Sequence, residues 1–294
     1  MRIFLTGANG QLGRELRRHA TISGYELIAM DHGALDITDA WAVNHALKNS
    51  GAAIVINAAA YTAVDRAEQE PEMAFAVNRD GPTCLAQSCA DLNIPLFHIS
   101  TDFIFDGQRD GYYREDDPAA PLGVYGLSKW QGEEAVRHIL PAHVILRVSW
   151  VFGIHGHNFV KTILRLARER TTLQVVADQY GCPTYAGDAA EVLLRLAGRL
   201  ATEGDLDWGT YHYAGIPPTN WHGLAQSALD VARRYEDLKA RDIVPISTAD
   251  YPTPARRPAN SKLDCTRLKE RFGIEPRAWL EGLEVTINSL VIRS

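Results

Sequence analysis

The stretch Ile3-Phe-Leu-Thr-Gly-Ala-Asn-Gly-Gln-Leu-Gly13 decides the fold, because a short apolar run enters a turn punctuated by Gly7, Gly10 and Gly13. A periodic, helix-compatible segment follows from Leu16 to His19, so the order is strand, glycine turn and helix. Glycine permits positive φ and a close approach of a ligand, and the unpaired N–H groups of a helix start attract a pyrophosphate. The spacing G-x-x-G-x-x-G departs from the standard G-x-G-x-x-G fingerprint, so a dinucleotide site is predicted only together with its context.

A second apolar run supplies that context. The segment Tyr25-Glu-Leu-Ile-Ala-Met30 ends at Asp31, close to the ~20-residue offset at which an acid binds the adenosine ribose in such sites. Asp31 is alternatively a turn residue that caps a loop. The sequence leaves both interpretations open.

Composition and charge limit the classes of partner. The chain has 294 residues and a formal net charge of -6 spread along its length, which gives no electrostatic reason to expect nucleic acid or an anionic membrane as partner. No apolar segment approaches the ~20 residues that span a bilayer, and the N-terminus shows no signal-peptide pattern. The four cysteines lack metal-ligand spacing: Cys84, Cys89, Cys182 and Cys265. We therefore expect a cytoplasmic protein with reduced thiols and no metal centre.

Short apolar runs alternate with longer helical patterns in the first half, which predicts parallel β-α-β units with right-handed crossovers. The predicted strands are Ile3–Thr6, Glu26–Met30, Ala53–Asn57, Pro95–Ser100 and Val144–Val148. Within 65–93, Pro71 and the pair Gly81-Pro82 predict a helix, a break and a second helix. Residues 102–123 predict a long ordered loop at the carboxyl end of the fourth strand, where open parallel sheets bind ligands.

The second half has a looser rhythm. It predicts helices over Asn158–Arg170, Asp188–Leu200, Trp221–Ala240 and Ala278–Ile292, and a short strand over Gly209–Gly215. The sequence as a whole predicts a Rossmann-like, doubly wound α/β fold with a smaller C-terminal substrate-binding lobe. Residues 1–150 are expected to form mainly the dinucleotide-binding domain, and residues 151–294 mainly the lobe, with some segments returning to the first domain.

Tyr125-Gly-Leu-Ser-Lys129 is the second strong motif, because a Tyr and a Lys four residues apart project from the same face of a helix. A nearby ammonium favours the phenolate and is expected to lower the pKa of the phenol. The fourth predicted strand ends in Ser100-Thr-Asp102, which places the Thr101 hydroxyl at the same sheet edge, where it is expected to hold a carbonyl oxygen. An incidental exposed Tyr-Lys pair is the alternative for this spacing taken alone.

The glycine turn, the strand-end Ser-Thr and Tyr-x-x-x-Lys, in this order, form the pattern of the extended short-chain dehydrogenase/reductase superfamily. Within it the chain resembles the dTDP-4-dehydrorhamnose reductases nearly end to end. The resemblance is carried by 7–13, Val55–Asp65, Ser100–Gly107, Val124–Lys129, Arg147–Phe152, Asn158–Thr162, Asp178–Thr184 and Arg257–Ser261. It implies reduction of the C4 ketone of dTDP-4-dehydro-L-rhamnose by NADPH or NADH, in nucleotide-sugar and cell-surface polysaccharide synthesis, including lipopolysaccharide.

The resemblance also implies a role for each matching residue. The implied cofactor-binding residues are Gly7, Gly10, Gln11, Leu12, Gly13, Asp31, Asp36, Ile37, Ala60, Tyr61, Thr62, Tyr125 and Lys129. The implied catalytic residues are Tyr125, Lys129 and Thr101, and the implied sugar contacts are Thr101, Asp102 and Trp150. Arg257 is a candidate for the substrate diphosphate, because a guanidinium binds phosphate in a bidentate manner, although a solvated role is equally open. NADH versus NADPH and the nucleotide base stay undecided.

Three alternatives compete with this assignment. Related sugar-nucleotide dehydratases carry Glu after Thr-Asp, and Phe103 cannot supply that acid. Another sugar-nucleotide reductase or an epimerase is a weaker enzymatic alternative. A non-catalytic, cofactor-binding regulatory subunit of methionine adenosyltransferase is the rival from another class. Some members of the resembled family dimerise around Mg²⁺ held by glutamates, which allows a homodimer and makes Glu15 and Glu191 candidates, with solvated helix glutamates as the simpler interpretation. His155 and His157 are expected to be solvated loop residues.

Overall fold

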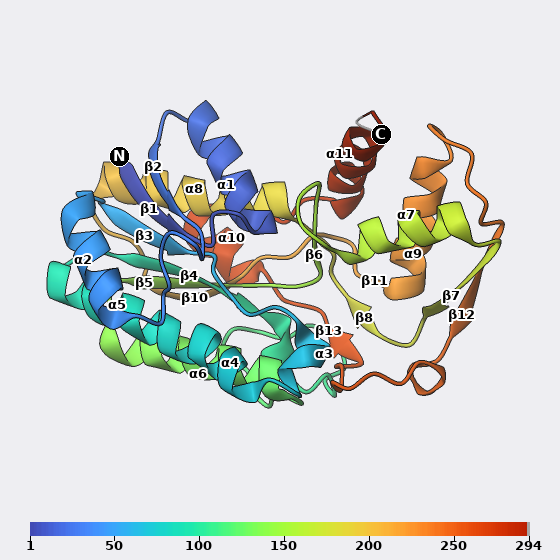
Figure 1. The fold of residues 1–294 in the computed structure, drawn as a ribbon, viewed down its shortest axis with the longest axis horizontal. Helices are drawn as coiled ribbons and strands as arrows, with labels where there is room; N and C mark the ends of the chain where they lie inside the picture. Colours follow the sequence, from blue (N-terminus) through green and yellow to red (C-terminus); the bar gives the residue numbers. More distant parts are fainter. Residues whose placement is uncertain (293–294) are drawn as a thin grey trace.

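The structure is a computed structural model that describes residues 1–292. Its centre is a six-stranded sheet in which every neighbouring pair is parallel, in the order β10-β5-β4-β3-β1-β2 (Figure 1). The strands are β1 (Arg2–Thr6), β2 (Glu26–Met30), β3 (Ile54–Asn57), β4 (Leu96–Thr101), β5 (His143–Val148) and β10 (Gly209–His212). The strand order reverses at β1, so β1 and β3 flank the switch point at which such sheets bind ligands.

Both faces of this sheet are covered by helices. One face packs against α1 (Gln11–Ile22), α8 (Ala186–Glu203) and α10 (Thr266–Phe272), and the other against α2 (Ala40–Ser50), α5 (Gly81–Leu92) and α6 (Val124–Ile139) (Figure 1). Successive strand residues alternate between the two cores: Ile3 and Leu5 lie in the α1 core, whereas Phe4 lies in the α2 core. The predicted doubly wound α/β class is therefore confirmed, and the five predicted strands are present within two residues of their expected bounds.

The predicted helical break at Gly81-Pro82 is wrong. After α3 (Val64–Ala67), the helix α4 (Pro71–Phe75) continues through the π-helical turn η1 (Ala76–Asp80) into α5. Pro82 has no N–H to donate, and the wider π turn lets the chain stay helical where an ordinary α-helix loses that bond. A Cβ at Gly81 would approach Ile37 Cδ1 to 2.5 Å, so the glycine leaves room for the Ile37 side chain in its present position.

The remaining elements form a second core beside the sheet (Figure 1). Its helices are α7 (Phe159–Glu169), α9 (Trp221–Ala232) and α11 (Trp279–Val291). Its short strands are β6 (Val151–Phe152) with β9 (Thr184–Tyr185), β7 (Thr172–Val176) with β12 (Asp242–Ile246), and β8 (Tyr180–Gly181) between β11 (Thr219–Asn220) and β13 (Asn260–Ser261). Two 3-10 turns complete the list, η2 (Asp102–Ile104) and η3 (Thr248–Asp250).

Two expectations for this half need correction. The helix beginning at Trp221 ends at Ala232 instead of Ala240, because the chain turns there to run into β12, which pairs in parallel with β7. The strand expected over 209–215 ends at His212. The division into 1–150 and 151–294 stays a prediction, although α8, β10 and α10 follow residue 150 and pack on the large sheet. Within residues 1–292, no helix combines the length and apolar character needed to cross a membrane.

Candidate active site

The glycine turn lies between the carboxyl end of β1 and the start of α1. Gly7 has a φ of 70°, and a Cβ on it would overlap the backbone of Ala58 and Ala59 beyond β3. A Cβ on Gly13 would overlap the backbone of Gly7 and Ala8. The N-cap of α1 is Gly10, and no side chain among the described residues caps this helix start. The turn therefore combines tight backbone packing with open N–H groups, which fits a bound pyrophosphate.

Asp31 follows β2 directly and lies beside this turn. Its Oδ1 accepts the N–H of Ala34 at 3.0 Å, and its Oδ2 accepts the side-chain amide of Asn9, which belongs to the glycine turn. The structure thus brings Asp31 to the predicted place and also shows it capping a loop. Each carboxylate oxygen keeps a further acceptor position, so a ribose contact stays a prediction.

Asp36 and Ile37 follow in the same loop. The N–H and hydroxyl of Thr38 donate to Asp36 Oδ1 at 2.9 and 2.8 Å, and these bonds lower the pKa of Asp36. The side chain of Ile37 is buried against Gly81 and the α2 core. The end of the Ile37 side chain is therefore not free to contact a ligand, and the predicted adenine contact would have to come from other atoms of this loop.

The loop Ala60–Thr62 leaves β3 and is held by Asn78, a residue that sequence reasoning missed. Asn78 is fully buried in η1, and its Oδ1 accepts the N–H of Tyr61 at 2.8 Å. Its Nδ2 donates to the carbonyl of Tyr61 at 3.0 Å and to Ser128 Oγ at 3.1 Å. One side chain thereby ties the predicted nicotinamide side to the Tyr125–Lys129 helix.

Tyr125 lies in the first turn of α6, whose N-cap, Gly123, has no side chain to offer. Glu68 caps the helix instead, because its Oε1 accepts the N–H of Val124 at 2.8 Å. A Cβ on Gly123 would collide with that carboxylate, so the glycine makes room for the long-range cap. Glu68 was also missed, and no local pattern signals a partner 56 residues away.

Thr101 and Asp102 meet Tyr125 at the end of β4. Thr101 Oγ1 donates to Asp102 Oδ1 at 3.1 Å, accepts the N–H of Phe103 at 3.2 Å and lies within hydrogen-bond reach of the Tyr125 phenol. Burial raises the pKa of Asp102 to about 6, although the neighbouring Ser261 and Thr101 hydroxyls oppose the shift. The predicted Tyr125, Thr101 and Asp102 therefore do lie together.

The electrostatics of the Tyr125–Lys129 pair differ from the expectation. Burial, with a smaller contribution from Asp102, raises the pKa of Tyr125 to about 12. Lys129 Nζ donates to the Ile99 carbonyl at 2.6 Å, and burial lowers the pKa of Lys129 to about 8. The expected lowering of the phenol pKa does not occur in this arrangement, because burial dominates and Lys129 is not among the groups that shift the pKa of Tyr125.

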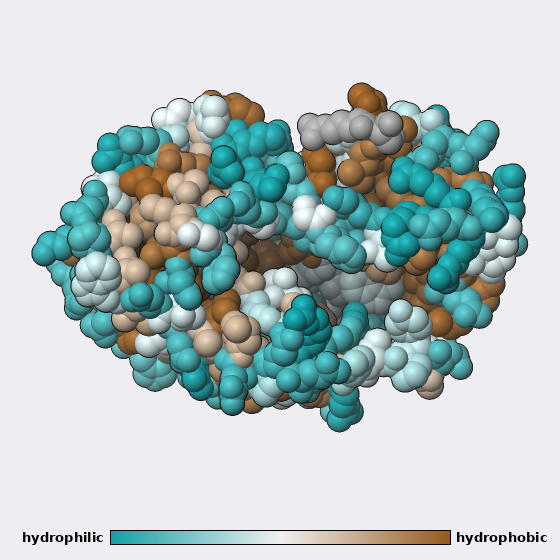
Figure 2. All heavy atoms as spheres, viewed as in Figure 1, coloured by the Kyte–Doolittle hydropathy of each residue, from teal (hydrophilic) through white to brown (hydrophobic). Residues whose placement is uncertain are grey.

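Trp150 approaches the same place from the second half of the chain. Its φ is 48°, its ring stacks on Trp221 with 3.5 Å between centroids, and its Nε1 donates to Ser261 Oγ at 3.1 Å. Ser261 also lies close enough to Asp102 to lower its pKa, so it brings Trp150 near the end of β4. Figure 2 shows a recess in the molecular surface between the two halves, in the region where these segments converge.

Arg257 is engaged within the protein. Its Nη2 donates to Asp65 Oδ2 at 2.8 Å, and the N–H of Ala255 reaches the other oxygen of Asp65. This ion pair ties the loop before β13 to α3. Its neighbour Arg256 lines a small hollow together with Tyr125. The role of Arg257 toward a diphosphate stays a prediction. It requires the guanidinium to bind the diphosphate while it remains paired with Asp65.

The candidate Mg²⁺ ligands do not form a metal site. Glu15 is fully buried with its Oε2 2.8 Å from Arg18 Nη2, and His155 Nε2 lies 3.7 Å from its other oxygen. Glu191 is bound by both terminal nitrogens of Arg277 at 2.6 and 2.7 Å. Across residues 1–292, no group of three or more His, Cys, Asp or Glu side chains is arranged to hold a metal ion. Each glutamate is paired with an arginine, so within residues 1–292 of one chain the donor set gives no support for Mg²⁺.

Comparison with known proteins agrees with this geometry. The model of the RmlD substrate binding domain family matches residues 1–292. The chain is 45% identical to a dTDP-4-dehydrorhamnose reductase of Aggregatibacter actinomycetemcomitans over 285 residues, 96% of this chain and 97% of that protein. Crystal structures of two further dTDP-4-dehydrorhamnose reductases superpose with TM-scores of 0.91. The one from Clostridium acetobutylicum is 35% identical and covers 99% of both chains. The one from Bacillus anthracis, in complex with NADP, is 34% identical and covers 98% of this chain and 99% of that one.

Proposed function

The chain belongs to the RmlD substrate binding domain family, and several of its curated relatives are dTDP-4-dehydrorhamnose reductases; from this premise we propose that it reduces dTDP-4-dehydro-L-rhamnose at C4 to dTDP-L-rhamnose. The observation that carries the proposal is the meeting of Tyr125, Thr101 and Asp102 at the carboxyl end of β4. Trp150 reaches this point from the second half of the chain through Ser261. A simple ketone reduction needs a hydride, one proton and a polarised carbonyl, and nothing else.

The cofactor proposed for this reaction is a nicotinamide dinucleotide, which supplies the hydride when bound. The glycine turn holds the pyrophosphate through the open N–H groups at the start of α1. Lys129, on α6 with its Nζ beside the Ile99 carbonyl of β4, donates to the nicotinamide ribose in this proposal. The loop Ala60–Thr62, held by Asn78, lines the nicotinamide side.

Tyr125 donates the proton to the oxygen at C4 as charge develops there. Because burial raises its pKa to about 12, the phenol is protonated throughout the neutral range and is ready to act as an acid. Thr101 orients the carbonyl oxygen beside the phenol. Asp102 and Trp150 contact the sugar, and the ionisation of Asp102, whose pKa is about 6, favours hydrogen bonds from sugar hydroxyls above that pH.

A steady-state assay with purified dTDP-4-dehydro-L-rhamnose and each cofactor in turn tests the function. We expect saturable, sugar-dependent oxidation of NADPH, NADH or both, followed by nicotinamide absorbance. Cofactor binding without turnover on this sugar would instead favour a regulatory module. Three points stay predictions: the cytoplasmic location, the homodimer and the supply of cell-surface polysaccharide synthesis. Light scattering of the purified protein measures whether it forms a homodimer.

Replacing Asp31 with Asn tests the ribose assignment. A carboxylate that accepts bonds from the adenosine ribose also repels a 2′-phosphate, so we expect weaker use of NADH and a relative gain for NADPH. Two charges 4 Å apart interact by about 1 kcal/mol in water and about 4 kcal/mol at an intermediate dielectric. Asp31 is only partly buried, so the NADPH/NADH ratio should rise nearer roughly fivefold than a thousandfold.

The measurement is kcat/KM for both cofactors at one fixed, low ionic strength, because salt screens the effect. The amide oxygen introduced by Asp31→Asn can still accept the N–H of Ala34, whereas the bond from the Asn9 side-chain amide is lost unless that amide turns over. An unchanged or lower NADPH/NADH ratio would leave Asp31 as a loop cap and move the ribose contact elsewhere.

A further inference from the structure

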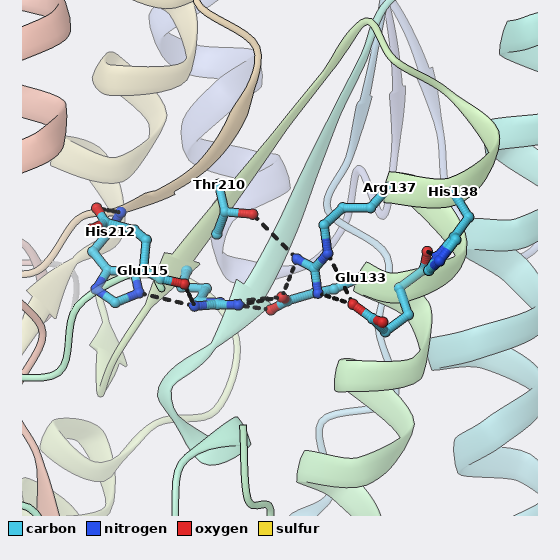
Figure 3. Close-up of polar contacts among 8 residues, drawn as sticks. Glu115, Glu133, Arg137, His138, Thr210 and His212 are labelled. Carbon is cyan, nitrogen blue, oxygen red and sulfur yellow. Dashed lines mark hydrogen bonds and ion pairs between the residues drawn. The ribbon is translucent and has the colours of Figure 1, made fainter. Parts of the chain in front are cut away.

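A buried ionic cluster lies directly behind Lys129. Glu133, one turn further along α6, and Arg147 on β5 are fully buried. Arg147 donates to both oxygens of Glu133, through Nε at 3.0 Å and Nη2 at 2.7 Å. Arg137 Nη1 adds a bond to Glu133 Oε2 at 2.9 Å and another to Thr210 at 3.2 Å (Figure 3). The carboxylate of Glu133 is therefore held from two elements at once.

The far end of the cluster fixes Arg147. Its Nη1 donates to the carbonyl of Glu115 at 3.1 Å, and the Glu115 side chain accepts the N–H of His212 at 3.0 Å (Figure 3). Burial keeps the pKa of His212 well below its ordinary value, so its ring is neutral at neutral pH. Burial opposes the ionisation of Glu133, but the charge and bonds of Arg147 outweigh it and lower the pKa of Glu133. The cluster thus keeps a permanent anion inside the core.

Lys129 is the buried cation next to that anion. Its Nζ donates to the carbonyl of Ile99 at 2.6 Å, and burial opposes its charge. Residues four apart on a helix face each other, with Cβ atoms ~5–6 Å apart, so Glu133 lies within range of the ammonium. Among the charged groups that the structure describes, the carboxylate of Glu133 is the one that acts to raise the pKa of Lys129.

Within residues 1–292, the other elements packed against α6 offer no comparable anion to Lys129. Their charged and titratable groups are Asp65 and Arg66 on α3, Glu72 on α4, Arg79 and Asp80 on η1, Cys84, Cys89 and Asp91 on α5, His98 on β4, Asp102 on η2, and His143 and Arg147 on β5. Burial lowers the pKa of His98 and His143 and raises that of Cys89, so these three are neutral near pH 7. Arg79 and Asp80 neutralise each other, and Asp102 hydrogen-bonds Thr101 and is not among the groups that shift the pKa of Lys129.

We propose that Glu133 is a positioning residue for the reduction: clamped by Arg147 and Arg137, it compensates the Lys129 ammonium inside the core and holds it at the end of β4. This inference rests on the proposed function only through the role of Lys129 toward the cofactor. A buried Glu-Arg pair is by itself weak evidence for stability, because desolvation of both charges offsets their attraction. Because the pair lies next to the buried Lys129, it can also supply a fixed negative charge that stabilises the ammonium.

The decisive variant is Glu133→Gln, which removes the charge and keeps the shape. Without the anion, the pKa of Lys129 is lower and its ammonium loses its proton more readily. In both proteins the affinity for nicotinamide cofactor should fall as the pH rises, and in the variant this fall should begin at a lower pH. An opposite charge within ~4–6 Å shifts a pKa by about 1–3 units. Lys129 and Glu133 are not in direct ion-pair contact, so this pH limb, the pH range over which the affinity falls, should move down by about one unit, at the low end of that range. The readout is the Kd for NADPH and NADH as a function of pH, measured by nicotinamide fluorescence without sugar.

Arg147→Met is the matched control. If the Glu133–Arg147 pair has only a structural role, both single variants should lose thermal stability and neither should change the pH at which the cofactor affinity falls. The electrostatic role predicts that Arg147→Met destabilises as well but leaves the limb in place or moves it to higher pH, because Arg137 still holds Glu133. If Glu133→Gln alone does not fold, the double variant Glu133→Gln/Arg147→Met removes both charges, leaves no orphaned buried ion in the pair, and should show the lowered limb.

The outcomes separate this inference from the proposed function. A wild-type protein that binds cofactor without reducing the sugar would refute the reductase, while the binding titration would still report on Glu133. The inference would be overturned, even in an active reductase, if the cofactor affinity fell at the same pH in the wild type and in the folded Glu133→Gln or double variant.

Discussion

Tyr125→Phe is expected to lower kcat about 10²–10⁴-fold, the usual scale of general acid catalysis, and to leave the Kd for the cofactor unchanged. The substitution removes the phenolic proton and keeps the ring that packs edge-to-face on Phe103, with 5.4 Å between centroids. The raised pKa of Tyr125 sharpens the expectation, because the wild-type phenol carries its proton at every neutral pH. Steady-state kinetics and a fluorescence titration of cofactor measure the two quantities separately.

Tyr211→Phe is the matched control for this prediction. Tyr211 is a buried tyrosine on β10, and its hydroxyl donates to the carbonyl of Asp207, away from the site. Its removal should cost some stability and leave kcat near that of the wild type. A Tyr125→Phe protein that turns over at nearly the wild-type rate would remove Tyr125 from the mechanism, since no other phenol is assigned to donate the proton.

The sheet could be predicted because its strands are buried on both faces and appear as short, continuous apolar runs. In Ile3–Leu5 each residue is apolar whichever helical layer it contacts, so the run is visible without knowing the partner helices. The glycine turn was visible for a similar reason: backbone overlap at Gly7 and Gly13 leaves no room for any side chain. Local geometry imposes these residues, and local patterns therefore reveal them.

What the sequence could not show depends on contacts between distant segments. In the sequence, nothing distinguishes Asn78 from the other residues of an Ala-rich helical segment. Only the fold shows that η1 places it against Tyr61 and Ser128. Glu68 caps α6 from 56 residues away, which no spacing rule anticipates. The misplaced break at Gly81-Pro82 has a related origin, because a π turn is a rare way to accommodate proline and carries no sequence signal.

The electrostatics of the site were equally hidden. Tyr and Lys four residues apart predict a shared helix face, and α6 provides it. The sequence does not reveal that Lys129 is buried and that Tyr125 is largely shielded from water. Desolvation then shifts the two pKa values in the directions that favour the neutral phenol and the neutral amine. A motif thus locates the chemical groups, whereas the depth of burial sets their protonation.

Lys129→Met is expected to reduce function and to preserve or increase stability. Loss of the ammonium removes the predicted donor to the nicotinamide ribose, so the Kd for cofactor should rise and kcat/KM should fall by about 10²-fold or more, as for other residues that position the reacting groups. Stability should change in the opposite direction because the buried ammonium is unfavourable to folding. Burial lowers the pKa of Lys129 from 10.5 to about 8, which corresponds to about 3 kcal/mol.

The sign of the pH dependence follows from this shift. Below pH 8 lysine is charged in both states and the folded protein bears the full cost, whereas between pH 8 and 10.5 the unfolded chain binds more protons and stability rises with pH. Methionine has no charge to desolvate, so the variant should exceed the wild type in stability most clearly near pH 7 and lose that advantage as the pH approaches 10.5.

Thermal unfolding of both proteins across this pH range measures the difference, with Lys48→Met, on the exposed face of α2, as the control. Lys48→Met should change neither activity nor the slope of stability against pH. A Lys129→Met protein that is strongly destabilised at pH 7 would mean that the charged lysine stabilises the core through Glu133 by more than its desolvation costs. The site would then combine stability and function in one residue, instead of trading one for the other.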